Sequence, residues 1–420
     1  MTHVHLATAA EAAEADGAAE APGEPRVPGA AGTRAPGLER WTTEWCTRPE
    51  SFALLAPEWR RLHRACPAAT PFQSHAWLDS WWRSYGSGRG PRVLLVRRAG
   101  QLVAAAPLMR APGPVPALVF LGGPISDFGD VLIDAAHAAP AARALAAALH
   151  RAARTAVLDL RELRPGAAAE SLLAHWTGPL ARRADSVCLE LPALPMDEQL
   201  ARLPRSTAQR VRAKLRKTDA LGVESRAVPA EEVPAAVRTL LGLHRLQWQG
   251  RRVTPEHLRP RFRDHLVRAA RAMVRSGEAA VTEYRLDGRV VAADLTLLSP
   301  SLAGGYLYGA DPGLRSRKAD VTSMLLRTCA RYAAGEGRTT LSLLRGTEPY
   351  KEHWRPERVV NSRLLLARRR TAPLLWLRTA QAGARARAAH WARARAARAA
   401  KDGTPGRTAA PGAPAGRPGG

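Results

Sequence analysis

The sequence has little of what membrane spans, disulfides and metal sites require. No stretch approaches the roughly 20 apolar residues of a membrane-spanning helix, and the start, MTHVHLATAAEAAEADG, lacks the basic and then apolar segments of a secretory signal. The 4 cysteines form no CxxC pair and have no histidine at metal-ligand spacing. We therefore predict a cytoplasmic protein with no metal site, whose cysteines are buried as small apolar side chains.

Acidic side chains are also scarce, with 37 Asp and Glu against 63 Lys and Arg, and a net charge of +26. Residues 1–38 hold five acidic and two basic side chains, whereas residues 368–420 hold twelve basic and one acidic. The rest of the excess positive charge lies in residues 39–367. Such a charge suits nucleic acid, an anionic membrane surface or an anionic small molecule.

Composition predicts a tail at each end. Residues 1–38 contain almost no large apolar side chains, so they should form a disordered tail. Residues 371–420 form a basic Arg/Ala-rich tail, which is rich in helix formers up to Ala400 and in Pro and Gly from about Thr404. Its arginines would point in nearly all directions around a helix. We interpret it as a solvated tail, with weak contact to nucleic acid or an anionic membrane as the alternative.

Two core segments look like copies of one another, VLLVRRAGQLVAAAPLM (93–109) and AVTEYRLDGRVVAADLTLL (280–298). In each, a strand meets a glycine turn, Ala99-Gly100 or Asp287-Gly288, and returns as a second strand, as in a tight hairpin. We infer a duplicated domain.

The same order of elements follows each hairpin. After a third strand we expect a helix, at 138–153 or at 320–334 with Asp320 as its N-cap, and then another strand, at 156–160 or 339–344. The fold class predicted is α+β, with two tandem mixed-sheet domains and flanking helices. The domains are residues 39–205 and 223–370, and a basic linker helix, residues 206–222, joins them.

The run Arg345-Gly346-Thr347-Glu348-Pro349-Tyr350-Lys351 before Trp354 resembles the signature of the BioF2-like acetyltransferase domain of CelD-type proteins. Further similar pieces are FQSHAWLDSWW (72–82), LGGPISDFGDVLID (121–134), the basic helix after Pro204, His244-x-x-x-Trp248 and GYLYGADPGL (305–314). This resemblance implies a double GNAT-like fold, related to that of the Fem peptidoglycan transferases. It also implies an N-acyltransferase that carries an acetyl or other acyl group from acyl-CoA to an amine of a small or cell-envelope- or polysaccharide-related acceptor.

The sequence departs from this family before the second repeat's helix, where 314–321 lacks the family's Ser-Pro-Gly. In GNAT folds the helix N-terminus at this place holds the pyrophosphate of coenzyme A. We expect Arg315, Arg317 and Lys318 to supply the positive charge for the acyl-CoA instead.

Lys351 is the first candidate for catalysis, because Fem-type relatives place a lysine after an aromatic residue here to stabilise charge on the reacting acyl group. The alternative is a surface lysine. Tyr350 could donate a proton to the leaving group or pack under the substrate. Glu348 could act as base, or be solvated or paired with Arg345, and His244 is an alternative base or a structural histidine.

Candidate substrate-binding residues surround this group. Trp248 shares a helix face with His244, and Asp127 and Asp130 could hold a cationic acceptor or cap a turn. Asp311 is most simply a turn residue. Tyr308 and Arg345 complete the predicted set. The Trp-rich helix is predicted to be core.

Two other functions fit the charge. One is a Fem-like transferase that takes an aminoacyl group from charged tRNA, which is a polyanion. The other is a non-catalytic protein that binds nucleic acid or an anionic surface through the basic tail and the linker helix.

Overall fold

The structure is a computed structural model, and it describes residues 40–86, 90–247, 249, 254–335, 337–381, 383–384, 391 and 395. The N-terminal tail, the Pro/Gly-rich end beyond Thr404 and the candidate Trp248 lie outside the described residues. Predictions for them stay predictions.

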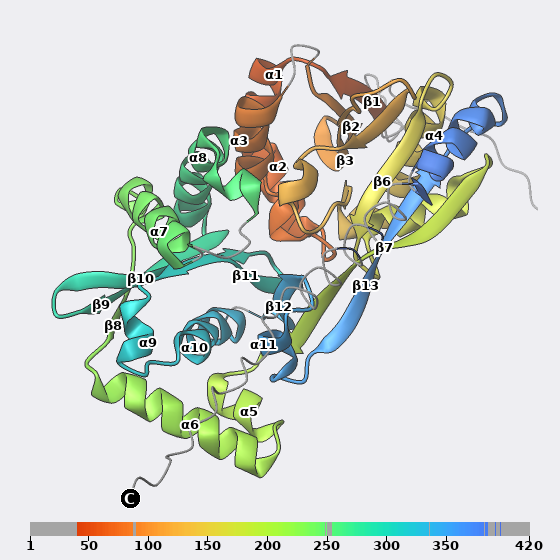
Figure 1. Cartoon of the computed structure of the whole chain (residues 1–420). Helices are drawn as coiled ribbons and strands as arrows, with labels where there is room; N and C mark the ends of the chain where they lie inside the picture. The colour runs from red at the N-terminus through yellow and green to blue at the C-terminus, as the bar shows by residue number, and fades with distance from the viewer. Residues whose placement is uncertain are drawn as a thin grey trace, which may run out of the picture. The chain divides into compact units, whose positions relative to one another are not determined.

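The strands of the described residues form a 13-stranded mixed sheet in the order β1-β2-β3-β4-β6-β13-β7-β12-β11-β10-β9-β8, with β5 paired to β3 (Figure 1). The first half supplies β1 (Trp41–Cys46), β2 (Arg92–Arg98), β3 (Gln101–Arg110), β4 (Ala117–Phe120), β5 (Leu132–Ile133), β6 (Val157–Leu163) and β7 (Leu180–Pro192). The second half supplies β8 (Glu224–Ala227), β9 (Ala279–Leu286), β10 (Arg289–Leu298), β11 (Leu302–Ala310), β12 (Thr340–Arg345) and β13 (Glu357–Leu366). The predicted fold class is confirmed.

Helices occupy corresponding places in the two halves, before the hairpin and after the third strand. The first half contains α1 (Pro49–Leu54), α2 (Ala56–Ala65), α3 (His75–Tyr85) and α4 (Ala138–Ala152). The second contains α7 (Val233–Gln247), α8 (Pro260–Ser276), α9 (Gly313–Ser316), α10 (Val321–Ala333) and α11 (Pro349–Glu352). Between the halves lie α5 (Met196–Ala201) and α6 (Arg205–Ala220), so the predicted linker helix is present.

Both predicted hairpins form at the predicted turns. Ala99 and Gly100 have φ of 48° and 84°, and Asp287 and Gly288 have φ of 53° and 73°. Two successive residues with positive φ match the right-handed twist of the flanking strands, which explains the glycine in each turn. The internal repeat therefore reflects a repeated structural unit.

The two halves exchange their last strands, so the two predicted sheets are continuous. β7 follows β6 in the chain but pairs with β12 of the second half, while β13 follows β12 but pairs with β6 of the first. β7 and β13 also pair with each other. Each half of the continuous sheet thus contains one strand from the other half of the chain.

The helices before the hairpins share one core. The Trp-rich α3 packs on α8, where the rings of Trp77 and His265 lie edge to face with centroids 4.5 Å apart. Trp77, Trp81 and Trp82 are buried, so their predicted core role is confirmed. The 4 cysteines are also buried and free, as predicted.

The beginning of the basic tail packs on the first half. Residues 372–381 are helical, and Leu375 joins a buried apolar cluster with Val157 and Leu365. Arg378 is buried, and its Nε lies 3.0 Å from Asp159 Oδ2, a carboxylate that also binds Arg363. This part of the tail therefore differs from the solvated segment expected from composition, because Asp159 gives one of its arginines a buried partner.

Helix α7 lies unusually close to β11 at Gly309. A Cβ on Gly309 would collide with backbone atoms of Leu240, Leu243 and His244. We predict that Gly309→Ala lowers the free energy of unfolding by about 1–3 kcal/mol, because backbone atoms cannot rotate away from an added methyl group. Urea unfolding measures this, with Gly242→Ala as control, since a Cβ on Gly242 meets nothing within 4 Å. Equal stability of the two variants would contradict the close approach.

Candidate functional site

The candidate site lies where two parallel strands of the second half separate. β11 and β12 are paired at Leu302–Thr340, Ala303–Leu341 and Gly304–Ser342, and no further along. Beyond that point a register shift interrupts the pairing of each strand with its outer neighbour. A gap therefore opens between the two strands, where side chains already engage part of the backbone: the Leu344 N–H donates to Ser342 Oγ and the Arg345 N–H to Asp127.

In the first half the equivalent gap is filled. β4 and β6 pair at Ala117–Val157 and Leu118–Leu158 and then separate. Gly129 of the following loop enters there and donates its N–H to the Glu162 carbonyl at 3.0 Å. A Cβ on Gly129 would collide with the Arg161 carbonyl and the Phe120 ring, so glycine is required. A loop of the chain itself thus occupies the place that is open in the second half.

A cavity of about 810 Å³, here called the central cavity, occupies the open gap. Its lining includes Gly305, Tyr306, Leu307 and Tyr308 of β11 and Leu343, Leu344 and Arg345 of β12. Leu325, Leu326 and Cys329 of α10 line it, and so do Trp81 and Tyr85 of α3 and Arg261 of α8. The cavity is therefore walled by both strands of the gap and by helices of both halves.

The RGTEPYK segment lies at the cavity and buries its lysine. Lys351 Nζ is 3.0 Å from the Arg345 carbonyl, 3.5 Å from the Gly346 carbonyl and 2.8 Å from Glu348 Oε2. An ammonium has three donors, and the longest of these bonds is the easiest to exchange for a substrate oxygen. Lys351 is therefore a buried cation in the cavity wall, unlike the surface lysine of the alternative interpretation.

Tyr350 stands beside this lysine with its side chain partly exposed in the cavity. Burial raises the pKa of the Tyr350 phenol well above its ordinary value, and neighbouring Tyr308 and Glu348 raise it further. The phenol therefore keeps its proton at neutral pH. Glu348, predicted as a base, is engaged by Lys351.

His244 lines the cavity as a neutral side chain. Its Nδ1 is 2.7 Å from the Tyr308 carbonyl, which can only accept, so Nδ1 carries the proton. Its Nε2 is 3.4 Å from Nδ1 of His257. Burial lowers the pKa of both imidazoles, that of His257 to about 4. The basic nitrogen of His244 thus already has a partner.

Arg345 and Asp127 both line the cavity, and they bind each other. Asp127 accepts from Arg345 Nε at 2.6 Å and from its backbone N–H at 3.2 Å. Arg345 Nη1 lies 3.2 Å from Glu162 Oε1, and Nη2 donates to the Pro124 carbonyl at 2.6 Å. Glu162 also accepts from Asn361. This network joins the first-half loop to the site.

Backbone strain marks the same place in both halves. Leu344 and Glu162, in β12 and β6, have φ of 60° and 58°, which is costly for residues with a side chain. Leu344 lines the cavity and Glu162 binds Arg345. Sequence reasoning missed Glu162 and Asn361, because no local pattern marks residues that meet only across strands.

Several predicted site residues lie elsewhere. Asp130 is buried and accepts the backbone N–H groups of Val131, Ala168 and Ala169, while burial raises its pKa to about 7. Asp311 accepts the N–H of Gly313 at 2.7 Å, as a turn residue does. The structure therefore places neither carboxylate among the cavity-lining residues.

The predicted cofactor-binding cations lie before α10 and outside the cavity lining. Arg317 pairs with Asp287 on the surface, Arg315 is in α9, and Lys318 has a φ of 59°. The N-cap of α10 is Asp320, as predicted. Its Oδ1 accepts the Ser323 N–H at 3.3 Å, and its Oδ2 lies 3.1 Å from Lys214 Nζ.

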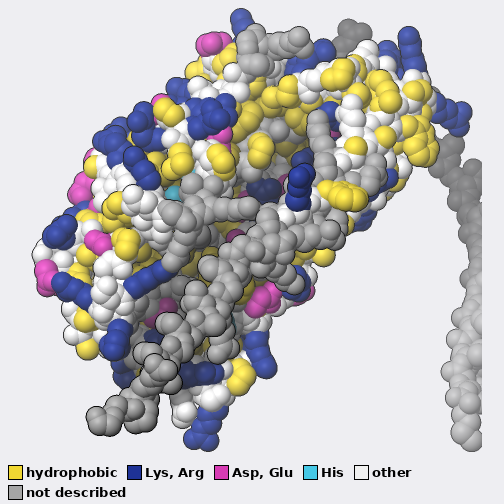
Figure 2. Space-filling view, viewed as in Figure 1, with side chains coloured by type: hydrophobic (Ala, Val, Ile, Leu, Met, Phe, Trp, Pro, Cys, Tyr) yellow, Lys and Arg dark blue, Asp and Glu magenta, His cyan; other side chains and the backbone are white. Residues whose placement is uncertain are grey.

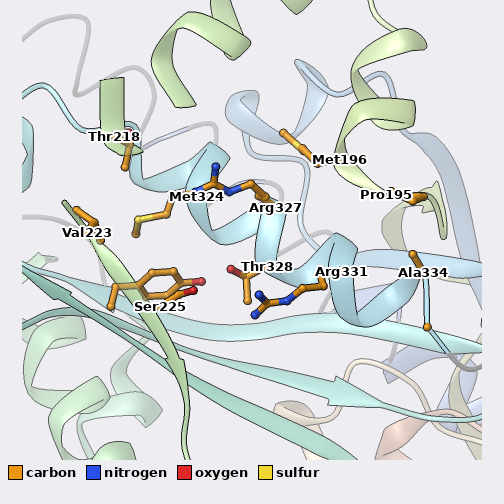
Figure 3. A pocket seen from close by; sticks show the side chains of 12 residues that line it. Pro195, Met196, Thr218, Val223, Ser225, Met324, Arg327, Thr328, Arg331 and Ala334 are labelled. Carbon is orange, nitrogen blue, oxygen red and sulfur yellow. The ribbon is translucent and has the colours of Figure 1, made fainter. Parts of the chain in front are cut away.

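A second cavity of about 510 Å³ lies between α6, α10 and β8, and we call it the outer cavity (Figure 3). Arg327, Thr328 and Arg331 of α10 line it together with Ser225 of β8 and Met196 of α5. Asp219 binds Arg327 with both oxygens, at 2.7 and 3.0 Å. The outer cavity therefore has little unpaired charge besides Arg331.

Positive charge is spread over the surface. In the part of the face that Figure 2 draws in colour, Lys and Arg side chains are scattered, with no single continuous patch. No helix in the described ranges is long and apolar enough to cross a membrane. Nor do the described His, Cys, Asp and Glu side chains form a group of three that could hold a metal ion.

Comparison with known proteins assigns the second half to a class. Residues 205–352 match the family model described as the acetyltransferase (GNAT) domain, and this match includes the open gap, α10 and Lys351. These residues of the second half are therefore similar to a GNAT acetyltransferase domain, and most of the candidate site lies within them.

Solved structures share this fold over most of the described chain. FemX is 12% identical with a TM-score of 0.55, over 77% of this chain and 98% of that one. A conserved protein of unknown function from Bacteroides thetaiotaomicron is 11% identical with a TM-score of 0.52, over 75% and 97%. No curated protein matches the sequence.

Proposed function

We propose that this protein is an N-acyltransferase that joins an acyl group to an amine in the central cavity. The observation that carries the proposal is the open gap between β11 and β12, with the buried Lys351 in its wall. An extended donor arm can lie between the two separated strands. Within the superfamily, the RGTEPYK motif favours a BioF2-like, CelD-type acetyltransferase that acts in the cytoplasm.

The residues of the cavity can serve each part of the reaction. The amine nitrogen attacks the acyl carbonyl carbon, a C–N bond forms, and the carbonyl oxygen becomes an oxyanion. Lys351 stabilises that charge where burial keeps water away. When the bond to the leaving group breaks, the Tyr350 phenol can give it a proton and later regain one from the amide nitrogen.

The donor proposed first is acetyl-CoA or another acyl-CoA, and one observation opposes it. At the N-terminus of α10, where GNAT folds hold the pyrophosphate, the Asp320 carboxylate already accepts the Ser323 N–H. A diphosphate there would meet a like charge. This favours the second donor, an aminoacyl group on tRNA, because its ester contains no diphosphate that must be bound at this helix.

Calorimetric titration with acetyl-CoA and desulfo-CoA at two salt concentrations distinguishes the donors. If acyl-CoA is the donor, we expect micromolar binding that weakens with salt, and about three- to tenfold tighter binding by Asp320→Ser, which keeps the cap without the charge. Lys318→Ser, which removes an exposed cation, should weaken binding. No binding by any of these proteins would contradict an acyl-CoA donor.

A further inference from the structure

Asp294 is a buried carboxylic acid in the central cavity for which the reaction outlined above has no use. It lies in β10 with its side chain 5% exposed, and it belongs to the cavity lining. Its Oδ2 accepts from Thr296 Oγ1 at 3.4 Å, whereas its Oδ1 is buried without a hydrogen-bond partner in the described protein. A buried carboxylate oxygen without a partner is costly unless a ligand satisfies it.

The groups around Asp294 offset little of the free-energy cost of burying its charge. Thr282 lies opposite on β9, and Arg331 of α10 is the charged neighbour that favours ionisation. Tyr308 lies directly opposite on β11, and Tyr284 and Cys329 complete the titratable groups around it. Burial outweighs these effects and raises the pKa of Asp294 to about 7.

Asp294 and the proposed catalytic lysine belong to opposite sides of the gap, in β10 next to β11 and in the segment after β12, and both line the central cavity. Its strand partner Tyr308 is close enough to Tyr350 to raise the pKa of that phenol. Tyr350 is next to Lys351 in the chain, and Asp294 and Lys351 both belong to the lining of the central cavity. A cation bound at Oδ1 would then be near the acyl group that Lys351 is proposed to stabilise.

We propose that Asp294 binds the acceptor as a primary ammonium group and takes its proton, an inference that rests on the proposed acyl transfer. One N–H proton moves from the ammonium nitrogen to Asp294 Oδ1, which leaves a neutral amine and a protonated carboxyl. The amine lone pair then attacks the acyl carbon. The second proton of the nitrogen leaves with the departing group, so charge and atoms balance.

The titration of Asp294 tests this without knowledge of the acceptor. Infrared spectra of the full chain over a pH series, minus those of Asp294→Asn, isolate its carboxyl band. Methylammonium chloride is the probe, because it is the part common to every primary amine, and potassium chloride at equal concentration is the control. We expect the midpoint to fall by about one pH unit or more with methylammonium, since a bound cation favours the carboxylate.

Each outcome decides the proposal. Asp287→Asn, an exposed carboxylate in the turn before the same strand, should leave the band and its shift unchanged. Equal midpoints in methylammonium and potassium chloride would overturn the amine site. The acyl-CoA titration is separate, so donor binding without a methylammonium shift would leave the acyltransferase proposal standing and make Asp294 structural. A shift without donor binding would keep the amine site and remove acyl-CoA.

Discussion

Lys351→Met should lower the turnover of acyl transfer by about 10²–10³-fold and leave the fold intact. Methionine keeps the apolar stem of the buried side chain and removes the ammonium, so packing in the cavity wall is largely preserved. The loss should appear in kcat more than in KM, because the charge is needed when the oxyanion forms. Steady-state kinetics with the best amine from an acceptor screen measures it.

Two variants control for other causes. Lys217→Met removes an exposed lysine outside the cavity, and it should leave kcat nearly unchanged. Glu348→Gln removes the carboxylate that lies 2.8 Å from Lys351 Nζ and tests whether this ion pair holds the lysine in place. If Lys351→Met turned over like the unmodified protein, Lys351 would have no part in the chemistry.

Local sequence signals predicted the elements well. The glycine turns after Ala99 and Asp287, the cap at Asp320 and the basic linker helix depend on residues close in the chain, and each formed where expected. The repeat of hairpin, strand, helix and strand predicted the duplicated fold for the same reason.

What the sequence could not predict depends on pairings between distant segments. The exchange of β7 and β13 sets which strand borders each gap, and no local pattern encodes it. The loop with Gly129 fills the gap of the first half, whereas the gap of the second half stays open as the central cavity, although the sequence predicts the same order of elements in both halves. The predicted pair Asp127 and Asp130 separates because one meets Arg345 and the other three backbone N–H groups.

The sequence contains a signal that marks Asp294 as a candidate functional residue. In VVAADLTLL it is the one charged residue of a run that otherwise predicts a buried strand. Lys, Glu, Arg and Asp are almost never fully buried without a partner. An acid in such a strand is therefore a reason to expect a functional site, and it needs no knowledge of the fold.

Arg345→Ala should lower the free energy of unfolding by about 3–5 kcal/mol, because it removes the cation that lies nearest to two partly buried carboxylates, Asp127 and Glu162. Urea unfolding measures the loss. Arg317→Ala breaks the exposed pair with Asp287 and should cost about 1 kcal/mol or less.

A partial rescue separates charge from packing in this network. The triple variant Arg345→Met, Asp127→Asn and Glu162→Gln has neither the cation nor the two stranded charges, so it should be more stable than Arg345→Ala. The network also holds the first-half loop at the cavity, and the triple variant lacks it. We therefore expect this variant to recover more of the stability than of the activity. If Arg345→Ala cost no more than Arg317→Ala, the network would not hold the two halves together, and the site would need another support.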